Sequence, residues 1–243
     1  MNKFNLFKPP LWMRFFYPFF YVKRGLYDGI KSIVGDLRGD ILDIGCGKKP
    51  YEDLFQSKNS YTGIDVEISG HNHASSKIDI FFDGKSLPFD NSAFDTIVMF
   101  EVIEHVENLD FLLSEVRRVL KPGGFLIISC PFIWREHEVP YDFRRFTERG
   151  LINHISNYNF LPVVTKKLTK GDEAFVQILI GELHQAVRIF FGTFAYFFSI
   201  PIYFFLSISV KIISYPFMVN LSNNHAFYLT TLGTFKLQKL QDN

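Results

Sequence analysis

The sequence predicts an α/β protein in which helices cover both faces of a parallel β-sheet. Short apolar runs of strand length alternate along the chain with segments of helical periodicity, an order that is typical of parallel sheets. Two glycines one residue apart follow the first run, in ILDIGCGKKP (residues 41–50), and a carboxylate follows each of three later runs. The predicted strands are residues 40–44, 60–64, 78–82, 94–100, 125–130, 160–168 and 227–237.

Helix-end residues support the helical segments between these strands. Gly39 can end a first helix, Pro50 suits the first turn of a second, and Thr147 is a good N-cap for a later one. The segment KPGG (121–124) ends an amphipathic helix that precedes it. The predicted helices are residues 27–37, 50–57, 109–120 and 147–156.

Charge and cysteine content exclude two classes of protein. The 243 residues contain 26 Lys and Arg against 25 Asp and Glu, so no overall positive charge indicates a nucleic-acid partner. The two cysteines, Cys46 and Cys130, both lie at the ends of apparent buried strands. This favours a reducing compartment over a disulfide framework.

The glycine turn after the first strand indicates a nucleotide-like ligand without phosphate. Pro50 stands where the third glycine of a dinucleotide fingerprint belongs, and a phosphate loop of the Walker type is absent. Asp43 places negative charge beside the turn, which repels a pyrophosphate and suits an ammonium group. Asp65, at the end of the second strand, can accept hydrogen bonds from both hydroxyls of a ribose. S-adenosylmethionine has an ammonium group, a ribose and an adenine, and no phosphate.

Five segments within residues 40–132 occur in an order that is similar to class I S-adenosylmethionine-dependent methyltransferases. They are ILDIGCG, YTGID, DGKSLPFDNSAFD, FEVIEHV and LKPGGFLIISCP, and they resemble the ubiquinone and menaquinone type most closely. The resemblance implies a Rossmann-like seven-stranded sheet that a hairpin of strands six and seven completes. One departure is Lys49, which replaces the third small residue of the first motif.

The resemblance also implies which residues contact S-adenosylmethionine. It assigns Asp65 to the ribose hydroxyls and Val66 to the neighbourhood of the adenine, whereas a bare tight turn is the alternative for the glycines alone. The predicted cofactor residues are Asp43, Gly45, Cys46 and Gly47 at the methionine end, Asp65, Val66, Asp83 and Gly84 at the nucleoside, and Glu101 near the methionine moiety.

His105 is the candidate catalytic base. An oxygen acceptor must lose a proton during methyl transfer, and Glu101, Glu104 and His105 are spaced to share one helical face. The EVIEHV string is similar to quinone O-methyltransferases in which a Glu, Glu, His set can hold a divalent metal. We expect no metal here, because the string is common in enzymes without one, and the alternative for His105 is a bond to backbone groups.

The segment after the fifth strand, PFIWREHEVPYDFRRFT (131–147), is the expected acceptor site. Its aromatic residues and histidine can stack and form hydrogen bonds, and its arginines can hold an acidic or phosphorylated acceptor. Similar strings recur in methyltransferases that resemble those of bacterial surface-glycan clusters. The alternative is a structural loop whose arginines pair with Glu136, Glu138 and Asp142. The predicted acceptor residues are Trp134, His137, Tyr141, Arg144 and Arg145.

Two apolar segments predict contact with a membrane. Residues 1–25 are aromatic and basic, as in segments that lie at a membrane surface, or they pack onto the domain. Residues 189–210 carry no charge, and a helix of that length covers roughly 33 Å. Because Pro201 interrupts this run and the last strand must return to the sheet, we expect a helical hairpin over 175–224 that dips into one leaflet. An oligomer interface and a true span are the alternatives.

Four regions and one function follow. The regions are the N-terminal segment 1–25, a methyltransferase domain 26–174, the apolar hairpin 175–224, and the last strand with its tail, 225–243. The expected function is methyl transfer to a small-molecule or lipid-linked acceptor, such as a glycan intermediate or a quinone precursor, on the cytoplasmic side of the membrane. The alternative is a membrane-anchored binding or scaffold protein that keeps the fold and transfers nothing. Nucleic acid is not an expected partner.

Overall fold

The computed structural model describes residues 6–35, 37–67, 75–194, 201–206, 208–209 and 227–239. By its internal contacts the chain forms two compact units. One comprises Gly29–Lys166 and Thr231–Asn243, and the other comprises Met1–Asp28 and Lys167–Thr230. The predicted boundaries after residues 25 and 174 lie near the boundaries of these units.

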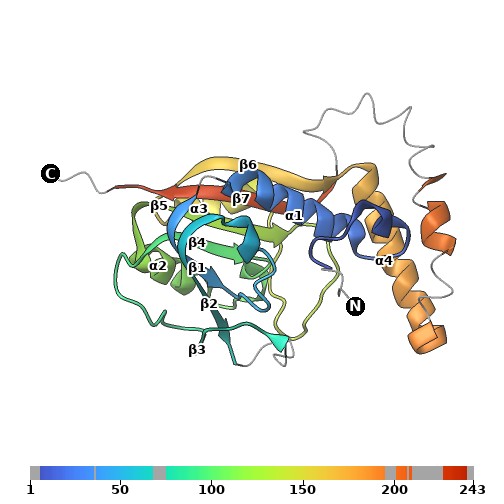
Figure 1. Ribbon diagram of the computed structural model, residues 1–243, viewed down its shortest axis with the longest axis horizontal. Coiled ribbons are helices and arrows are strands. Elements are labelled where there is room, and N and C mark those ends of the chain that lie inside the picture. The colour runs from blue at the N-terminus through green and yellow to red at the C-terminus, as the bar shows by residue number, and fades with distance from the viewer. Residues whose placement is uncertain are drawn as a thin grey trace. The chain divides into compact units, whose positions relative to one another are not determined.

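A seven-stranded sheet with the order β3-β2-β1-β4-β5-β7-β6 is the centre of the fold (Figure 1). The pairs β1–β2, β1–β4, β2–β3 and β4–β5 are parallel, as the alternation of strands and helices predicts. Because β1 and β4 are neighbours, the strand order reverses beside the glycine turn, where ligands bind in open α/β sheets. The strands are β1 (Arg38–Ile44), β2 (Ser57–Val66), β3 (Ile80–Phe82), β4 (Phe94–Phe100), β5 (Leu120–Pro131), β6 (Phe160–Lys170) and β7 (Tyr228–Leu237).

The last two strands run antiparallel and complete the sheet. The Gly171 N–H, just after β6, donates to the Phe227 carbonyl just before β7, at 2.7 Å. At the other end the Gln238 N–H donates to the Asn159 carbonyl at 3.0 Å. The end of β6 therefore lies beside the start of β7, so the sheet is mixed and ends in the predicted hairpin.

Apolar side chains cover both faces of the central strands. Leu42 and Ile44 of β1 belong to one buried cluster together with residues of α2 (Leu109–Val119) and α3 (Glu148–Ser156). Ile41 is equally buried, but it alternates with these residues along β1 and so points to the opposite face. Because both faces of β1 are buried, the strand reads as a continuous apolar run in the sequence.

The short helix predicted for residues 50–57 is replaced by a single 3-10 turn, η2 (Glu52–Leu54), and β2 begins at Ser57. Tyr51 and Phe55 are both buried, and Phe55 packs against the ring of Tyr61 at 5.5 Å between centroids. A helix this short gains too few hydrogen bonds to form alone, so the burial of its aromatic residues decides the path of the chain.

The second unit joins the N-terminal segment to α4 (Asp172–Phe191). Met13, Phe20 and Tyr21 form a buried cluster with Val176 and Ile180 of this helix. Gln177 is fully buried: its side-chain oxygen accepts from the Tyr21 N–H at 3.0 Å, and its amide donates to the Pro18 carbonyl. Residues 13–21 of the N-terminal segment therefore pack against the start of the predicted insertion, a contact between distant parts of the sequence.

No helix among the described residues is long and apolar enough to cross a bilayer. The helix α4 starts before the predicted boundary at residue 175, and it carries Glu182 and Arg188 within the segment assigned to the hairpin. Most of the second half of that hairpin, including residues 210–224, lies outside the described residues. Other helices in the described part of the chain are α1 (Phe20–Val34), η1 (Leu11–Phe15), η4 (Ile103–His105) and η5 (Gly192–Phe194), and residues 201–206 are also helical.

Candidate active site

The turn after β1 has a backbone that only glycine adopts easily. Gly45 and Gly47 have φ values of +71° and +47°, in the left-handed region. A Cβ atom on Gly45 would lie 2.5 Å from Val102 Cγ2, so the adjacent segment also excludes a side chain there. The N–H groups of Gly45 and Cys46 donate to the Ile64 carbonyl, at 2.8 and 3.1 Å. The turn is thus tied to the end of β2.

Lys49, the residue at which the sequence departs from the related motif, stabilises this turn through a buried ion pair. Its ammonium group forms an ion pair with Asp79, and its side chain is almost fully buried. The same Asp79 carboxylate accepts the Gly63 N–H at 2.7 Å, and the resulting bonds lower its pKa. The lysine therefore holds β2 against the segment that precedes β3.

Asp65 and Asp43 have different surroundings. The Asp65 carboxylate accepts the N–H groups of Gly47 at 3.1 Å and of Val66 at 2.9 Å, which fixes its orientation at the end of β2. Asp43 is only 3% exposed and accepts the Tyr61 hydroxyl at 2.8 Å. Burial raises the pKa of Asp43 to about 7. Asp65 lines the cavity described next, whereas Asp43 lies beneath the turn.

A cavity of about 920 Å³ opens at the carboxyl ends of β1, β2 and β4. This volume is at the upper end of the range for sites that bind nucleotide-sized ligands. Among the described residues, its walls carry the carboxylates Asp65, Glu67, Asp83, Glu101, Glu107 and Glu138, against one lysine, Lys85. Phe81, Phe82, Val102 and Phe111 supply apolar surface. The cavity therefore suits a ligand with a positive charge and a flat apolar portion.

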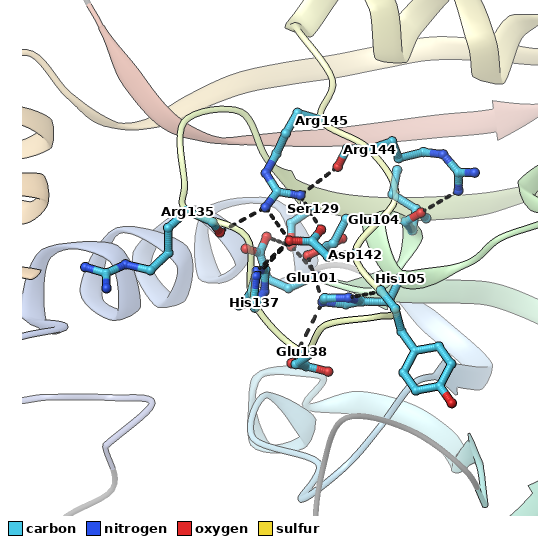
Figure 2. Close-up of polar contacts among 12 residues, drawn as sticks. Glu101, Glu104, His105, Ser129, Arg135, His137, Glu138, Asp142, Arg144 and Arg145 are labelled. Carbon is cyan, nitrogen blue, oxygen red and sulfur yellow. Dashed lines mark hydrogen bonds and ion pairs between the residues drawn. The ribbon is translucent and has the colours of Figure 1, made fainter. Parts of the chain in front are cut away.

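Glu101 is held in place by a serine on the neighbouring strand. Glu101 has a φ of +55°, an unusual value for a residue with a side chain. Ser129 of β5 is fully buried, and its hydroxyl donates to Glu101 Oε1 at 2.8 Å (Figure 2). The Glu101 N–H also donates to the Ser129 carbonyl at 3.1 Å. These bonds hold the strained residue and orient its carboxylate.

Glu104 and His105 lie together in the turn η4, and Glu101 precedes this turn instead of sharing a helical face with them. The Glu104 side chain is 1% exposed, and neither carboxylate oxygen has a hydrogen-bond partner among the residues that the structure describes. Burial, and then the charge of Glu101, raise the pKa of Glu104 well above its ordinary value. His105 Nδ1 lies 2.7 Å from the Tyr141 carbonyl, so in the neutral ring the proton is assigned to Nδ1 and the lone pair to Nε2. That Nε2 is 3.8 Å from Glu104 Oε1 and 3.8 Å from Glu138 Oε1.

The loop after β5 brings His137 beside His105, with ring centroids 4.7 Å apart. Asp142 accepts the His137 N–H at 2.9 Å and a guanidinium N–H of Arg145 at 2.7 Å (Figure 2). The hydrogen bonds from Arg145 lower the pKa of Asp142 far below its ordinary value. Arg145 also donates to the carbonyls of Arg135 and Arg144. Arg145 thus pairs with an acidic neighbour inside the loop.

Arg144 is also committed to internal bonds. Its guanidinium group donates to the carbonyls of Ile103 at 3.0 Å and Glu107 at 2.8 Å, and to that of Val106. These carbonyls flank η4, so Arg144 ties the loop after β5 to the segment that carries His105. Recognition of the acceptor by Arg144 and Arg145 stays a prediction. The pairing of Arg145 with Asp142 agrees with the alternative of a structural loop, whereas Arg144 bonds to backbone carbonyls instead of an acidic side chain.

The structure brings many of the predicted residues to one cavity. The predicted residues that do not line it are Asp43, Cys46 and Gly47, which lie in or beneath the turn, and Trp134, His137, Arg144 and Arg145 of the loop after β5. Burial raises the pKa of the Cys46 thiol to about 12, so this residue is a packed neutral group. The predicted site residues that do line the cavity are Gly45, Asp65, Val66, Asp83, Gly84, Glu101, His105 and Tyr141.

Ser129 and Glu138 were not predicted as site residues. Ser129 lies inside an apolar strand, IISCP, where a single hydroxyl is the only indication of a polar partner. The sequence indicates Glu138 only as an ion-pair partner for the loop arginines. In the structure it lines the cavity beside His105. Contacts between strands, or between a loop and a turn, determine both roles, and sequence spacing does not reveal them.

Comparison with known proteins supports a methyltransferase domain. Residues 42–128 match the family described as "Methyltransferase domain". A probable S-adenosylmethionine-dependent methyltransferase of Mycolicibacterium smegmatis is 32% identical over 97 residues, 38% of each chain. The ubiquinone biosynthesis O-methyltransferase of Pelagibacter ubique is 31% identical over 97 residues, 37% of this chain and 40% of that protein. The chain spans about two fifths of the length of these relatives.

Solved structures share the fold at low sequence identity. The crystal structure of the cyclase SpnF aligns with a TM-score of 0.57 and 16% identity, over 88% of this chain and 82% of that one. A phosphoethanolamine N-methyltransferase of Haemonchus contortus, in complex with S-adenosylhomocysteine, aligns with a TM-score of 0.52 and 16% identity, over 88% of this chain and 52% of that one. Residues 42–128 of this chain therefore match the methyltransferase-domain family, and the chain shares its fold with these two solved structures.

Proposed function

We propose that this protein transfers a methyl group from S-adenosylmethionine to an apolar or lipid-linked acceptor at the cytoplasmic face of a membrane. The acidic cavity at the switch point of the sheet is the observation that carries the proposal. In the described part of the chain, six carboxylates and one lysine line it, so it disfavours a pyrophosphate and favours the sulfonium and ammonium charges of this cofactor. Asp65, which two backbone N–H groups orient, is the acceptor for the ribose hydroxyls.

We assign roles to the other cavity residues by the resemblance to methyltransferases and by the place of each residue in the cavity wall. Val66, Asp83 and Gly84 surround the adenine, and Glu101 binds the ammonium group of the methionine portion. The acceptor oxygen attacks the methyl carbon in line with the carbon–sulfur bond, and the electron pair of that bond passes to sulfur. The acceptor proton moves to His105 Nε2, the nitrogen that does not bond to Tyr141. Alignment of the two reactants supplies most of the rate.

Calorimetric titration of the full chain with S-adenosylmethionine tests the cofactor. We expect binding that Asp65→Asn weakens about 10- to 100-fold, because a carboxylate loses charged hydrogen bonds to the ribose. Asp53→Asn is the matched control, since Asp53 is exposed and lies outside the cavity. Tighter binding of NAD than of S-adenosylmethionine would refute the proposal.

Two features support an apolar acceptor at a membrane. The cavity has aromatic walls, and the similar proteins include enzymes named for ubiquinone biosynthesis and for fatty-acid O-methylation. In the unit that contains the N-terminal segment, large apolar side chains are exposed near basic residues. Leu11 is 65% exposed, Trp12 50% and Phe16 43%, and Lys8 and Arg14 are close by in sequence. Exposed aromatics beside cations suit the surface of an anionic bilayer. Two free buried cysteines suit a reducing compartment.

Sedimentation with vesicles that contain anionic lipid tests the membrane contact. We expect the full chain to pellet with the vesicles, and the double variant Leu11→Ala/Trp12→Ala to move toward the supernatant. The control is Leu161→Ala/Val163→Ala, which removes two apolar side chains of comparable fractional exposure from β6, in the unit that carries the cavity. A chain that stays in the supernatant with vesicles, or a control that behaves like the test variant, would refute the membrane contact.

A binding protein without methyl transfer is the second candidate function. The fold alone does not require methyl transfer, because the same architecture occurs in a cyclase, a protein named for a different reaction. Incubation with methyl-labelled S-adenosylmethionine and a lipid extract separates the two. Label in the lipid fraction that His105→Gln reduces supports the enzyme, and cofactor binding with no labelled product supports the second candidate.

A further inference from the structure

We propose that Glu104, His105 and His137 form a binding site for one divalent transition-metal ion, such as Zn²⁺. One donor atom from each of these residues lies within 4.8 Å of the others. This set differs from the Glu101, Glu104, His105 set of similar quinone O-methyltransferases, because His137 takes the place of Glu101. The site stands on the geometry of these three side chains and does not depend on methyl transfer.

The buried carboxylate of Glu104 is the first argument. Within the described part of the chain, both of its oxygens lack a hydrogen-bond partner, although the side chain is 1% exposed. A buried carboxyl group without partners is costly when ionised, and either protonation or coordination to a cation compensates that cost. Arg145 does not supply that compensation by a direct bond, because its guanidinium group donates to Asp142 and to the carbonyls of Arg135 and Arg144.

The two imidazoles are prepared as ligands by the groups behind them. The Tyr141 carbonyl, 2.7 Å from Nδ1 of His105, leaves Nε2 with its lone pair directed toward Glu104 and Glu138 (Figure 2). Nδ1 of His137 lies 3.2 Å from the Asp142 carboxylate, which Arg145 holds in turn, although among the described residues this nitrogen makes no hydrogen bond. A carbonyl or carboxylate behind an imidazole is the usual outer support of a metal-bound histidine.

The distances and the surrounding charge favour an ion. Atoms that bind one Zn²⁺ at about 2.1 Å are about 3 to 4 Å apart, so small side-chain rotations would bring these three donors onto one ion. Glu101 and Glu138 add negative charge beside the site. Two nitrogens and one oxygen suit Zn²⁺, Co²⁺ or Mn²⁺ better than Mg²⁺, which prefers oxygen ligands.

Glu101 is less suited to be the third ligand, because Ser129 already bonds to its carboxylate at 2.8 Å. The backbone of Glu101 is itself strained, with a positive φ, just before η4. The ring of His137, in contrast, packs edge-on against the ring of His105. An ion on the other three residues would lie beside the cavity that His105 and Glu138 line. With an ion bound, His105 Nε2 is a metal ligand, so the role of base proposed above applies to the chain without the ion.

Titration of the chelator-treated full chain with Zn²⁺, and with Co²⁺ followed by its visible absorption, tests the site. We expect one equivalent to bind, and His137→Gln and Glu104→Gln each to weaken binding by at least about tenfold. His154→Gln is the matched control, because this histidine lies on α3 outside the set, and Glu101→Gln should change affinity less than His137→Gln.

Absence of a bound equivalent in the parent chain, or Zn²⁺ binding that His137→Gln does not weaken, would overturn the proposal. Binding of Mg²⁺ as tight as that of Zn²⁺ would do the same, because it would indicate carboxylates alone. If His137→Gln does not fold, the melting temperature is measured instead. Zn²⁺ should raise the melting temperature of the parent chain more than that of His105→Gln, and an equal rise in both would overturn the proposal. These readouts are separate from cofactor titration, so failure of the proposed function leaves them interpretable.

Discussion

The Ser129 hydroxyl lies 2.8 Å from Glu101 Oε1 and links β5 to the cofactor end of β4. The same Glu101 has a left-handed backbone, so the hydrogen bond also stabilises a conformation that is otherwise unfavourable. A buried serine on one strand thus controls the direction of a carboxylate on the next. This relationship leads to the first prediction.

Replacement of Ser129 by alanine should weaken S-adenosylmethionine binding by about five- to tenfold, since one hydrogen bond to a charged group is worth roughly 1.5 kcal/mol or less here. Global stability should fall less, because the backbone bond from Glu101 to Ser129 remains. Calorimetry and urea unfolding measure the two effects. Ser114→Ala, on the exposed side of α2, is the control, and equal cofactor affinity in both variants would contradict the assigned role of Ser129.

Gly45→Ala should destabilise the fold by about 2 to 4 kcal/mol, because the added Cβ meets Val102 and the backbone is left-handed. Gly35→Ala is the control, since nothing lies within 4 Å of its Cβ position. Urea unfolding midpoints report both. The double variant Gly45→Ala/Val102→Ala should recover part of the loss, and no recovery would show that the contact with Val102 contributes little.

Asp43 should make stability depend on pH near neutrality. Its folded pKa of about 7 exceeds the ordinary value of 3.8, so the folded state binds this proton more tightly than the unfolded state does. The contribution is therefore complete below about pH 4 and is lost as the pH rises through 7, to a total of about 2 to 4 kcal/mol.

Asp43→Asn removes this titration and can still accept the Tyr61 hydroxyl. The difference in unfolding free energy between parent and variant, measured from pH 4 to pH 8, should move steadily in favour of the variant. A difference that is constant over this range would show that Asp43 is already ionised at pH 4.

Arg144→Gln should lower stability by about 2 to 4 kcal/mol, because the guanidinium group serves the carbonyls of Ile103, Val106 and Glu107. Thermal unfolding of this variant and of Arg149→Gln, an exposed control on α3, measures the effect. Unchanged stability together with a higher KM for the acceptor would instead support the acceptor-binding role predicted from the sequence.

Much of the nucleotide end of the site was predictable because local patterns encode it. Apolar runs located β1, β2 and β4, and strand ends located Asp65, Asp83 and Glu101 at the cavity. The short helix at 50–57 was predicted wrongly, because burial of Tyr51 and Phe55 outweighs the helix-start preference of Pro50. The acceptor end was harder, since the bonds of Arg144 and Arg145 join segments that are distant in the sequence.

The sequence by itself determined the alternation of strands and helices, the glycine turn and the order of the acidic strand ends, because each depends on neighbouring residues and on periodicity. Only the tertiary structure decided that Asp43 is buried beneath the turn, that Ser129 holds Glu101, and that His137 lies beside Glu104 and His105. These relationships depend on which strands become neighbours and how a loop folds back, and the free energy of packing over the whole domain sets both.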